Sequence, residues 1–426
     1  MSGPRRVNVN PVDAVNRMTR QWIRSHTDDD VSSVFCAPSA WPLLALLTHA
    51  ADGPGRKELE YAVGLPAADA RTAALEILVS LREMTAVRSA LGIWATEQCL
   101  LDPMWTSGLP LGTVGRLAGD QALDAPLLNE WVQQHTGGLI EKMPVEVDDD
   151  TLLVLAAAMS VRTSWIRPFT DSGPSRRPDD GVWRDRRYST LSRVSGVMDR
   201  VNVAPTNHGE ITCLEILGED GITVHLVFGE QGRSARHVLE GGLLARSGYG
   251  RNGSELRVGE TAPGLVVEQV PDDEPHDRLL IQMPRFSIDV DHDLLDHPEV
   301  FGLDTVTDTN RGHFPGIGPQ LSAVSQAKQS AAARFTAKGF EAAAVTALVR
   351  LGGRWSPTPT RRVKQISVLL DRPFGFFASH RAGGLILAAG WVAEPEPYQP
   401  TDQELEFSAF LSSRAGPGTR LPSRAS

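Results

Sequence analysis

The chain has 426 residues, of which 41% are hydrophobic and 22% are charged, and this composition is that of a globular protein. Its net charge of -10 gives no electrostatic support to nucleic-acid binding. The longest apolar runs, such as residues 151–159, are too short to cross a bilayer. No apolar segment of the signal-peptide type follows the first ten residues. We therefore expect a cytoplasmic, monomeric protein with neither a membrane nor a nucleic acid as partner.

The first 85 residues predict helices. Apolar residues recur near every 3.6 positions in residues 11–27 and 38–51, and a Pro/Gly break at 53–55 precedes a third segment of this kind. Strand-like segments then begin at residues 87–97 and 152–165.

Beyond residue 200 strand-like segments dominate. Most of them alternate apolar and polar residues, as half-buried antiparallel strands do. They lie at residues 211–218, 222–230, 278–290, 363–380 and 383–395. Helices first and strands later predict an α+β fold rather than βαβ repeats. From Glu396 the chain becomes rich in Pro, Ser, Gly and Arg, and we expect this extension to be partly disordered.

Two motif matches lack the context that their chemistry requires. GYGRNG at 248–253 has the GxGxxG spacing, but no strand precedes it and no helix follows, so a dinucleotide site is not supported. His292 and His297 lie in the acidic stretch 289–299 at a spacing that does not bring two metal ligands onto one helix face. We interpret this stretch as a polar helix start.

The cysteines indicate a reducing compartment. Cys36, Cys99 and Cys213 lie far apart, each beside apolar residues, which is typical of buried free thiols. No CxxC and no Cys–His spacing indicates a metal site, and we expect neither a metal nor a cofactor.

The segment KGFEAAAVTALV at 338–349 is unusually rich in small residues. Ala and Glu favour helix, yet no stripe of larger apolar residues shows where such a helix would pack. Its composition alone fits a linker of low-entropy residues as well as a segment with a second structural role.

Six stretches in collinear order resemble the serpins, the serine protease inhibitor superfamily. NEWVQQHTGGLIEKMP at 129–144 is similar to the family's N-x-W-V-x-x-x-T-x-G-x-I motif. The other similar stretches are LVLAAAMSVRTSWIRPF at 153–169, IQMPRFSIDVDHDL at 281–294, FPGIG at 314–318, GFEAAAVTA at 339–347 and the hairpin from DRPFGFF to VAEP at 371–395. GFEAAAVTA resembles the hinge of the family's reactive centre loop.

The resemblance implies a bacterial-type intracellular serpin. Its expected fold is α+β, with about eight to nine helices around three β-sheets and a mobile reactive centre loop over residues 337–365. It implies a flexible N-terminus at 1–10, a single domain at 11–395 and the extension at 396–426.

The resemblance also implies a mechanism. The native state is metastable, and a serine protease cuts the exposed loop as a substrate. Residues 339–350 then insert into the central sheet as a new strand, carrying the acylated protease with them and distorting its active site. The protein would be a suicide inhibitor and not an enzyme.

The predicted hinge suits insertion. It comprises Gly339, Phe340, Glu341, Ala342, Ala343, Ala344, Val345 and Thr346. Gly339 would act as a pivot, and alanines lose almost no rotamer entropy. In a strand, Phe340 and Thr346 would face the underside of the sheet and Glu341 would face outward. About a dozen new ladder bonds at roughly 0.5–1.5 kcal/mol each would stabilise the inserted state by on the order of ten kcal/mol.

The family's spacing from the hinge glycine places the scissile bond at Gly353–Arg354 or Arg354–Trp355. We expect Arg354 to be the residue that the protease recognises. Its long cation suits a pocket with a buried carboxylate, so the target would be trypsin-like or subtilisin-like. The segment up to Pro373 is longer than is usual for the family, which leaves Arg350, Arg361 and Arg362 as rivals.

The chain departs from the family pattern at the hinge. Phe340 stands where Thr or Ser is usual, and Ala337 and Lys338 stand where Glu is usual. Forcing Phe340 into a tight slot would cost about 1–3 kcal/mol. Even 1.4 kcal/mol on the insertion barrier slows insertion tenfold, and a slow serpin is cut as an ordinary substrate.

The sheet-opening region, around Trp165, departs as well. The positions that carry polar side chains in the family correspond here to Ala37, Ala40, Ala157 and Gln329. Because the three alanines offer Gln329 no polar side chain, Gln329 needs another partner. A non-inhibitory serpin-fold binding protein, chaperone-like partner or recruited enzyme therefore stays open as the alternative. Under that hypothesis the Gly-rich segment 229–275 or the tail would form the site.

Overall fold

The computed structural model describes residues 10–398, except 98, 149–150, 175–181, 185, 273–274, 309, 319–322 and 341–360. Over these ranges it contains eight α-helices and three β-sheets, which confirms the α+β prediction. The helices are α1 (Pro11–His26), α2 (Ala37–Ala50), α3 (Gly53–Val63), α4 (Ala67–Glu83), α5 (Pro103–Ser107), α6 (Gln121–Thr136), α7 (Ala235–Ala245) and α8 (Pro298–Phe301). Within the same ranges, no helix combines the length and apolar character needed to span a membrane.

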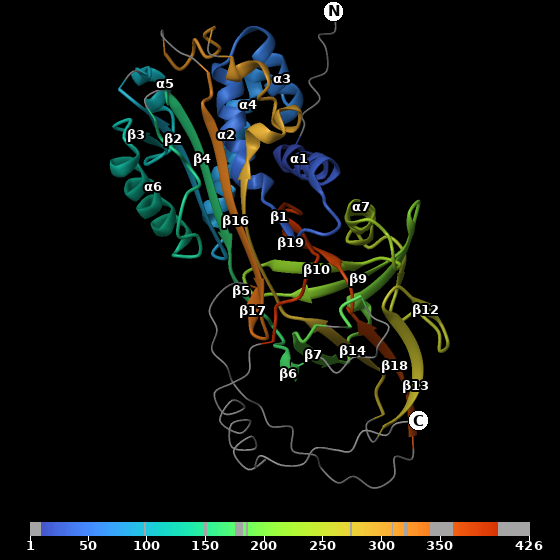
Figure 1. Cartoon of the computed structure of the whole chain (residues 1–426). Coiled ribbons are helices and arrows are strands. Elements are labelled where there is room, and N and C mark those ends of the chain that lie inside the picture. Colours follow the sequence, from blue (N-terminus) through green and yellow to red (C-terminus); the bar gives the residue numbers. More distant parts are fainter. Residues whose placement is uncertain are drawn as a thin grey trace, which may run out of the picture.

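The central sheet has the order β3-β2-β4-β16-β17-β5, and β15 pairs with β16. Its strands are β2 (Val87–Ala95), β3 (Val114–Arg116), β4 (Leu153–Val161), β5 (Thr163–Ser164), β15 (Phe286–Asp293), β16 (Gln326–Phe335) and β17 (Gly339–Phe340). Figure 1 shows β4 and β16 as long neighbouring strands, with helices α1–α4 towards one end and β17 at the other.

The second sheet runs β1-β20-β19-β10-β9-β8-β11. Its strands are β1 (Ser33–Phe35), β8 (Val201–Thr206), β9 (Gly209–Leu217), β10 (Ile222–Phe228), β11 (Arg251–Asn252), β19 (Phe374–His380) and β20 (Ile386–Val392). The third sheet runs β12-β13-β18-β14-β7-β6. Its strands are β6 (Thr170–Pro174), β7 (Ser189–Ser195), β12 (Thr261–Ala262), β13 (Leu265–Asp272), β14 (Arg278–Pro284) and β18 (Arg361–Leu369).

Strand β4 is buried on both faces, which explains its continuous apolar sequence. Val154, Ala156 and Ala158 join a small core with α6, whereas Leu155 and Met159 join the main core that includes α2. The central sheet is therefore covered on both sides along β4.

The acidic stretch 289–299 differs from the prediction. Strand β15 continues to Asp293, and α8 begins only at Pro298. The alternation along β15 buries the His292 side chain, whose Nε2 lies 2.7 Å from the carbonyl oxygen of Val34. Strand pairing with β16 along the whole of β15 outweighs the local helix-start signal.

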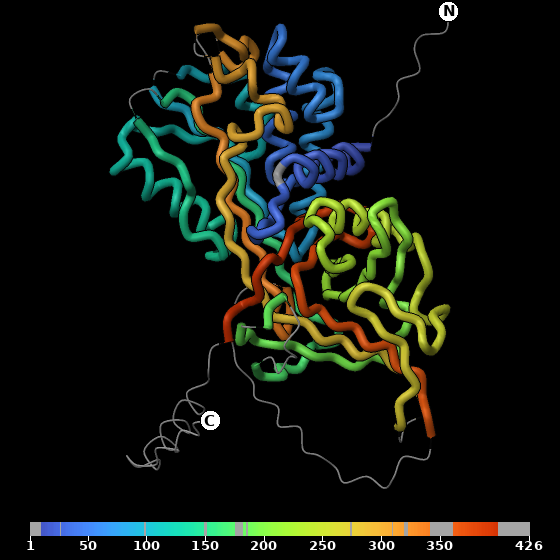
Figure 2. Tube along the Cα trace, turned by 45° about the vertical axis from the view of Figure 1, so that its right-hand side comes forward, coloured from blue at the N-terminus to red at the C-terminus, as the bar shows by residue number. Residues whose placement is uncertain are grey.

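The Gly-rich segment 229–275 contributes α7, β11, β12 and β13. GYGRNG lies in turns and in β11, and no helix follows it. Figure 2 shows the strands of the third sheet at the end of the molecule opposite to α3 and α4.

Candidate functional site

The start of the predicted hinge already belongs to the central sheet. Strand β17 lies between β16 and β5: Phe340 pairs antiparallel with Phe335 on one side and with Thr163 on the other. Gly339 pairs with Ser164. Two residues of the segment therefore occupy the end of the sheet before any cleavage.

The Phe340 side chain is buried in an aromatic cluster. Its side chain is 2% exposed, and its ring lies 6.0 Å from that of Phe376 in β19, beneath the central sheet. The packing strain expected for an aromatic ring at this position finds no support in this arrangement, because the ring adds to an existing cluster. Phe335, opposite Phe340, packs on Trp165 at 4.5 Å.

Gly339 is required by a close approach. A Cβ atom at this position would lie 2.3 Å from the carbonyl oxygen of Thr163, which is shorter than any normal contact. Its backbone is not in the left-handed region. The geometry therefore explains the glycine by lack of space, and the flexible pivot that we expected stays a prediction.

Trp165 fixes the turn between β16 and β17. Its backbone N–H donates to the carbonyl of Lys338 at 2.8 Å, and its indole Nε1 donates to the carbonyl of Thr336 at 2.9 Å. The N–H of Phe169 donates to the carbonyl of Ala337 at 2.8 Å. The residues that stand where the family has Glu are thus held through their backbone carbonyls.

The boundary between β4 and β16, here called the seam, is only partly closed. Residues 326–330 of β16 pair in parallel with residues 154–158 of β4. Beyond Ser330 and Ala158, the described residues of the two strands form no further ladder pairs with each other. The seam is therefore closed at one end, open in the middle and occupied by β17 at the other end.

Gln329 lies under the closed part of the seam, opposite Ala157. Its side chain is fully buried, and its Nε2 donates to Ser39 Oγ at 2.7 Å and to the Cys36 carbonyl at 3.0 Å. Its Oε1 is buried and has no hydrogen-bond partner among the described residues. One acceptor under the seam is thus left unsatisfied, at a cost of about 1–3 kcal/mol.

Ala37, Ala40 and Ala157 are all buried and provide no polar side chain. Ser39 replaces them in part, since it takes the amide hydrogen of Gln329 and donates to the Cys36 carbonyl at 2.9 Å. The sequence contained a signal for this residue, because Ser39 lies between Ala37 and Ala40 in the first turn of α2. A comparison restricted to the positions that are polar in the family does not identify Ser39.

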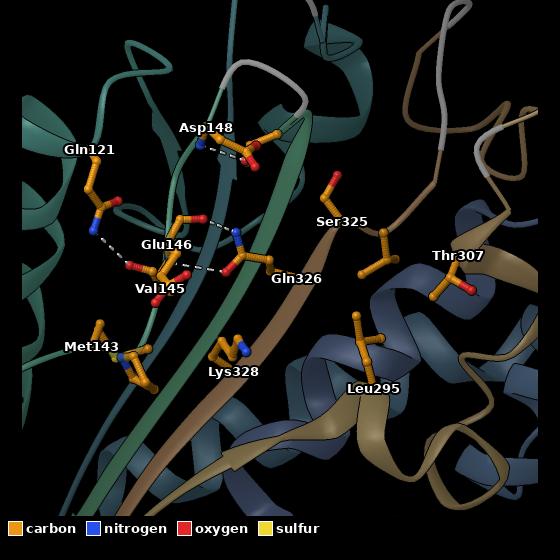
Figure 3. A pocket seen from close by; sticks show the side chains of 13 residues that line it. Gln121, Met143, Val145, Glu146, Asp148, Leu295, Thr307, Ser325, Gln326 and Lys328 are labelled. Carbon is orange, nitrogen blue, oxygen red and sulfur yellow. Dashed lines mark hydrogen bonds between the residues drawn. The ribbon is translucent and has the colours of Figure 1, made fainter.

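The segment 142–148, here called the strap, is tied to β16 beside the seam. Gln326 and the backbone of Glu146 form a reciprocal pair, in which the Glu146 N–H donates to Gln326 Oε1 at 3.2 Å and Gln326 Nε2 donates to the Glu146 carbonyl. Figure 3 shows this pair at the edge of an open pocket of about 840 Å³. Lys328, in the same pocket, forms an ion pair with Asp293 at 2.5 Å.

The buried thiols do not form a reactive centre. Burial raises the pKa of Cys36 and that of Cys213 to about 12, and burial also raises the pKa of Cys99. A thiol that stays protonated at neutral pH is a poor nucleophile and a poor metal ligand. Within the described ranges, no group of three or more His, Cys, Asp or Glu side chains is arranged to hold a metal.

The scissile-bond candidates Gly353, Arg354 and Trp355, together with the rival Arg350, lie outside the described residues, as do residues 341–346 of the hinge. Arg361 and Arg362 lie in β18, where they pair with Asp272 and Pro271.

Comparison with known proteins assigns this architecture. The sequence model of the family described as Serpin (serine protease inhibitor) matches residues 14–178 and 266–395, well over half of the chain. The chain belongs to the serpin family. It is 26% identical over 272 residues to plasminogen activator inhibitor 1 of Bos taurus, covering 63% of this chain and 61% of that protein. It is 22% identical over 384 residues to Serpin-Z1A of Triticum aestivum, covering 85% of this chain and 90% of that protein.

Solved serpin structures show the same fold. Native protease nexin-1 with heparin superposes with a TM-score of 0.67 and 17% identity, covering 91% of this chain and 100% of that chain. A thyroxine-binding globulin complex with thyroxine superposes with a TM-score of 0.66 and 16% identity, covering 91% and 98%. At these identities the likeness shows the fold alone.

Proposed function

We propose that this serpin is a suicide inhibitor of a trypsin-like or subtilisin-like serine protease, acts as a monomer, and has no catalytic activity of its own. It traps the acyl-enzyme by inserting residues 339–350 between β4 and β16. The observation that carries the proposal is β17, because the first residues of that segment already lie in the sheet at the end of the seam.

The register of β17 supports insertion without sliding. Because Phe340 pairs with Phe335 and Thr163, a continued strand would place Ala344 between Ala331 and Met159. It would place Thr346 between Gln329 and Ala157, the two residues that already face each other across the closed seam. The new strand could therefore enter without any change in the register of its neighbours.

The side chains of that strand fit the positions they would occupy. Residues an even number of positions from Phe340 would share its buried face. Thr346 would then bring its hydroxyl to Gln329, whose Oε1 lacks a donor. Glu341 would face the opposite side. With on the order of ten kcal/mol from new ladder bonds, the native state would be metastable.

Arg354 stays our proposed recognition residue. Arg361 and Arg362 are weaker rivals, because they lie in the β18 ladder, and a protease cleft binds extended, unpaired backbone. The side chain of Arg354 would reach a carboxylate in the protease pocket. We therefore propose a trypsin-like or subtilisin-like target.

We also propose a single domain at 11–395, in a bacterial-type intracellular, cytoplasmic protein. The main core supports the single domain, since it extends from Ala14 to Ala393. The buried free cysteines support the reducing compartment. The first residues of the proposed 396–426 extension contact the body, because the Glu396 N–H donates to the Arg285 carbonyl at 3.0 Å. Residues 1–9 of the proposed flexible N-terminus and residues 399–426 of the extension lie outside the described residues, whereas Asn10 caps α1.

Incubation with a trypsin-like and a subtilisin-like protease tests the proposal. We expect an SDS-resistant adduct with the unaltered protein. Thr346→Arg should be cut at the same bond without forming the adduct, because its charge would have to enter the sheet underside. Cleavage of the unaltered loop without adduct would contradict the proposal.

The alternative is a non-inhibitory serpin-fold binding protein, chaperone-like partner or recruited enzyme. The apolar sheet-opening region favours it, because Ala37, Ala40 and Ala157 are buried and provide no polar side chains there. In that case loop cleavage would leave the denaturation midpoint unchanged, whereas insertion of a new strand would raise it sharply.

A further inference from the structure

The chain that follows β20 returns to the junction between the central and third sheets. The Glu396 N–H donates to the Arg285 carbonyl at 3.0 Å, and the Ser189 N–H donates to the Glu396 carbonyl at 3.3 Å. One residue further on, Pro397 forms an antiparallel bridge with Tyr188. Glu396 and Pro397, here called the terminal strand, therefore lie between the start of β7 and Arg285.

Arg285 separates two strands that belong to different sheets. The residues before it form β14 of the third sheet, and the residue after it, Phe286, begins β15 of the central sheet. The Arg285 N–H donates to the Ser189 carbonyl at 2.9 Å, which attaches this residue to the third sheet. A displacement of Arg285 would therefore be passed directly to the end of β15 that lies beside the hinge.

The Arg285 side chain is a partly buried cation with two acids beside it. It is 22% exposed; its Nε lies 3.8 Å from Glu396 Oε2, and its Nη1 lies 4.0 Å from Oδ2 of Asp171 in β6. The Nε atom is buried and has no hydrogen-bond partner among the described residues. A guanidinium group stays protonated in proteins, so it cannot lower the cost of burial by losing its charge. Glu396 and Asp171 therefore supply the countercharge, because Ala337 and Lys338 in the turn before the hinge offer no acid.

A continuous set of ring contacts leads from Arg285 to the hinge. Phe286 pairs with Phe335 in the β15–β16 ladder, and their ring centroids are 5.5 Å apart. The Phe286 ring also lies 5.2 Å from that of Phe376, the ring that receives Phe340. Phe335 in turn pairs with Phe340 between β16 and β17. Because closely packed interiors transmit displacements, a movement of Arg285 would reach Phe340 through these rings.

We propose that Glu396 is a positioning residue: through Arg285, it holds the end of β15 against the third sheet and thereby keeps Phe340 in the aromatic cluster. The terminal strand and its partner Ser189 both lie outside the residues that the serpin family model matches, 14–178 and 266–395. The contact therefore belongs to this chain's own sequence rather than to the matched family pattern. The inference goes beyond the proposed function, because a hinge held in this way is a property of the intact protein, whether or not a protease is trapped.

Glu394 offers a matched control for Glu396. It lies two residues earlier, and its carboxylate forms an ion pair with Arg186 at 2.6 Å, in which the two side chains are 51% and 57% exposed. Arg186 belongs to the connection between β6 and β7 and not to β14 or β15. Glu394→Gln therefore removes an ion pair of the same chemistry that does not involve Arg285.

The experiment measures amide hydrogen exchange in the intact protein at neutral pH. The reporters are the amides of Thr336 and Phe169, whose N–H groups donate to backbone carbonyls around the turn between β16 and β17 at 2.9 and 2.8 Å. We expect Glu396→Gln to accelerate their exchange roughly two- to fivefold, which is the effect of an ordinary partly exposed ion pair. Glu394→Gln should exchange like the unaltered protein.

Two further comparisons test the route through Arg285. A chain that ends at Pro395 loses the terminal strand and should exchange at least as fast as Glu396→Gln, whereas a chain that ends at Tyr398 keeps these contacts and should exchange like the unaltered protein. In an Arg285→Met background, Glu396→Gln should have no further effect, because the cation on which it acts is gone. The acceleration should also shrink at high salt, which screens the pair.

Equal exchange in Glu396→Gln and Glu394→Gln would overturn the positioning role, and so would an acceleration that persists in the Arg285→Met background. No protease takes part in this measurement, so its outcome is separate from that of the proposed function. Accelerated exchange in a protein that forms no protease adduct would support the positioning role and contradict inhibition. Adduct formation with equal exchange in the two variants would do the reverse.

Discussion

The substitution Thr346→Val tests the register of insertion most directly. In the intact protein, the buried Oε1 atom of Gln329 has no hydrogen-bond partner among the described residues, which do not include Thr346. After cleavage, Thr346 would lie beside Gln329 and donate its hydroxyl to that atom. The hydrogen bond would stabilise the cleaved form by about 1 kcal/mol, with a range of roughly 0.5–1.5 kcal/mol. Val has nearly the same shape but no donor.

The assay compares chemical denaturation of the intact and loop-cleaved forms. We expect Thr346→Val to lower the free energy of unfolding of the cleaved form by about 1 kcal/mol and to leave the intact form unchanged. A double-mutant cycle with Gln329→Met should show a coupling of the same size in the cleaved form only. Thr358→Val, downstream of the proposed scissile bond, is the matched control and should have no effect. A zero coupling in the cleaved form would refute the register derived from β17.

Three further substitutions test separate features. Phe340→Ala should lower the free energy of unfolding of the intact protein by about 3 kcal/mol in urea, because it removes a buried ring from contact with Phe376; an unchanged midpoint would mean that the ring is not seated. Arg354→Ala should abolish cleavage of the loop by trypsin-like proteases whereas Arg350→Ala should not, as read from fragment masses. Burial, aided by Arg246, lowers the pKa of His225 to about 4. As the pH falls, the unfolded chain therefore binds a proton at this histidine from about pH 6.5, before the folded chain does. The free energy of unfolding falls by about 2 kcal/mol between pH 7 and pH 5. In His225→Phe, the urea midpoints at pH 7 and pH 5 should therefore differ by less than they do in the unaltered protein.

The sequence indicates those parts of the fold that depend on local pattern. The helical period of residues 11–27 and 38–51 gives α1 and α2, and alternation beyond residue 200 gives most of the strands. Strand β13 could not be predicted in the same way. Only two of its residues pair with the neighbouring β12, and its long ladder is with β18, about a hundred residues further along the chain.

At the candidate site, the sequence indicates composition but not contacts. Alternation places Phe340 on a buried face, and the structure has it there. The ring of Phe376 that receives Phe340 and the Ser39 hydroxyl that satisfies half of the Gln329 amide both come from remote segments. The reason for Gly339 is equally non-local, since the atom that excludes a Cβ belongs to Thr163.

The fixed position of Phe340 limits which insertions the loop can accept. One residue added between Phe340 and Glu341 would send every later side chain of the inserted strand to the opposite face and bring Glu341 under the sheet. Additions in that stretch must therefore come in twos, whereas no such rule applies beyond the scissile bond. A peptide epitope grafted into residues 356–360 should therefore be tolerated where the same graft at Ala343 would not be.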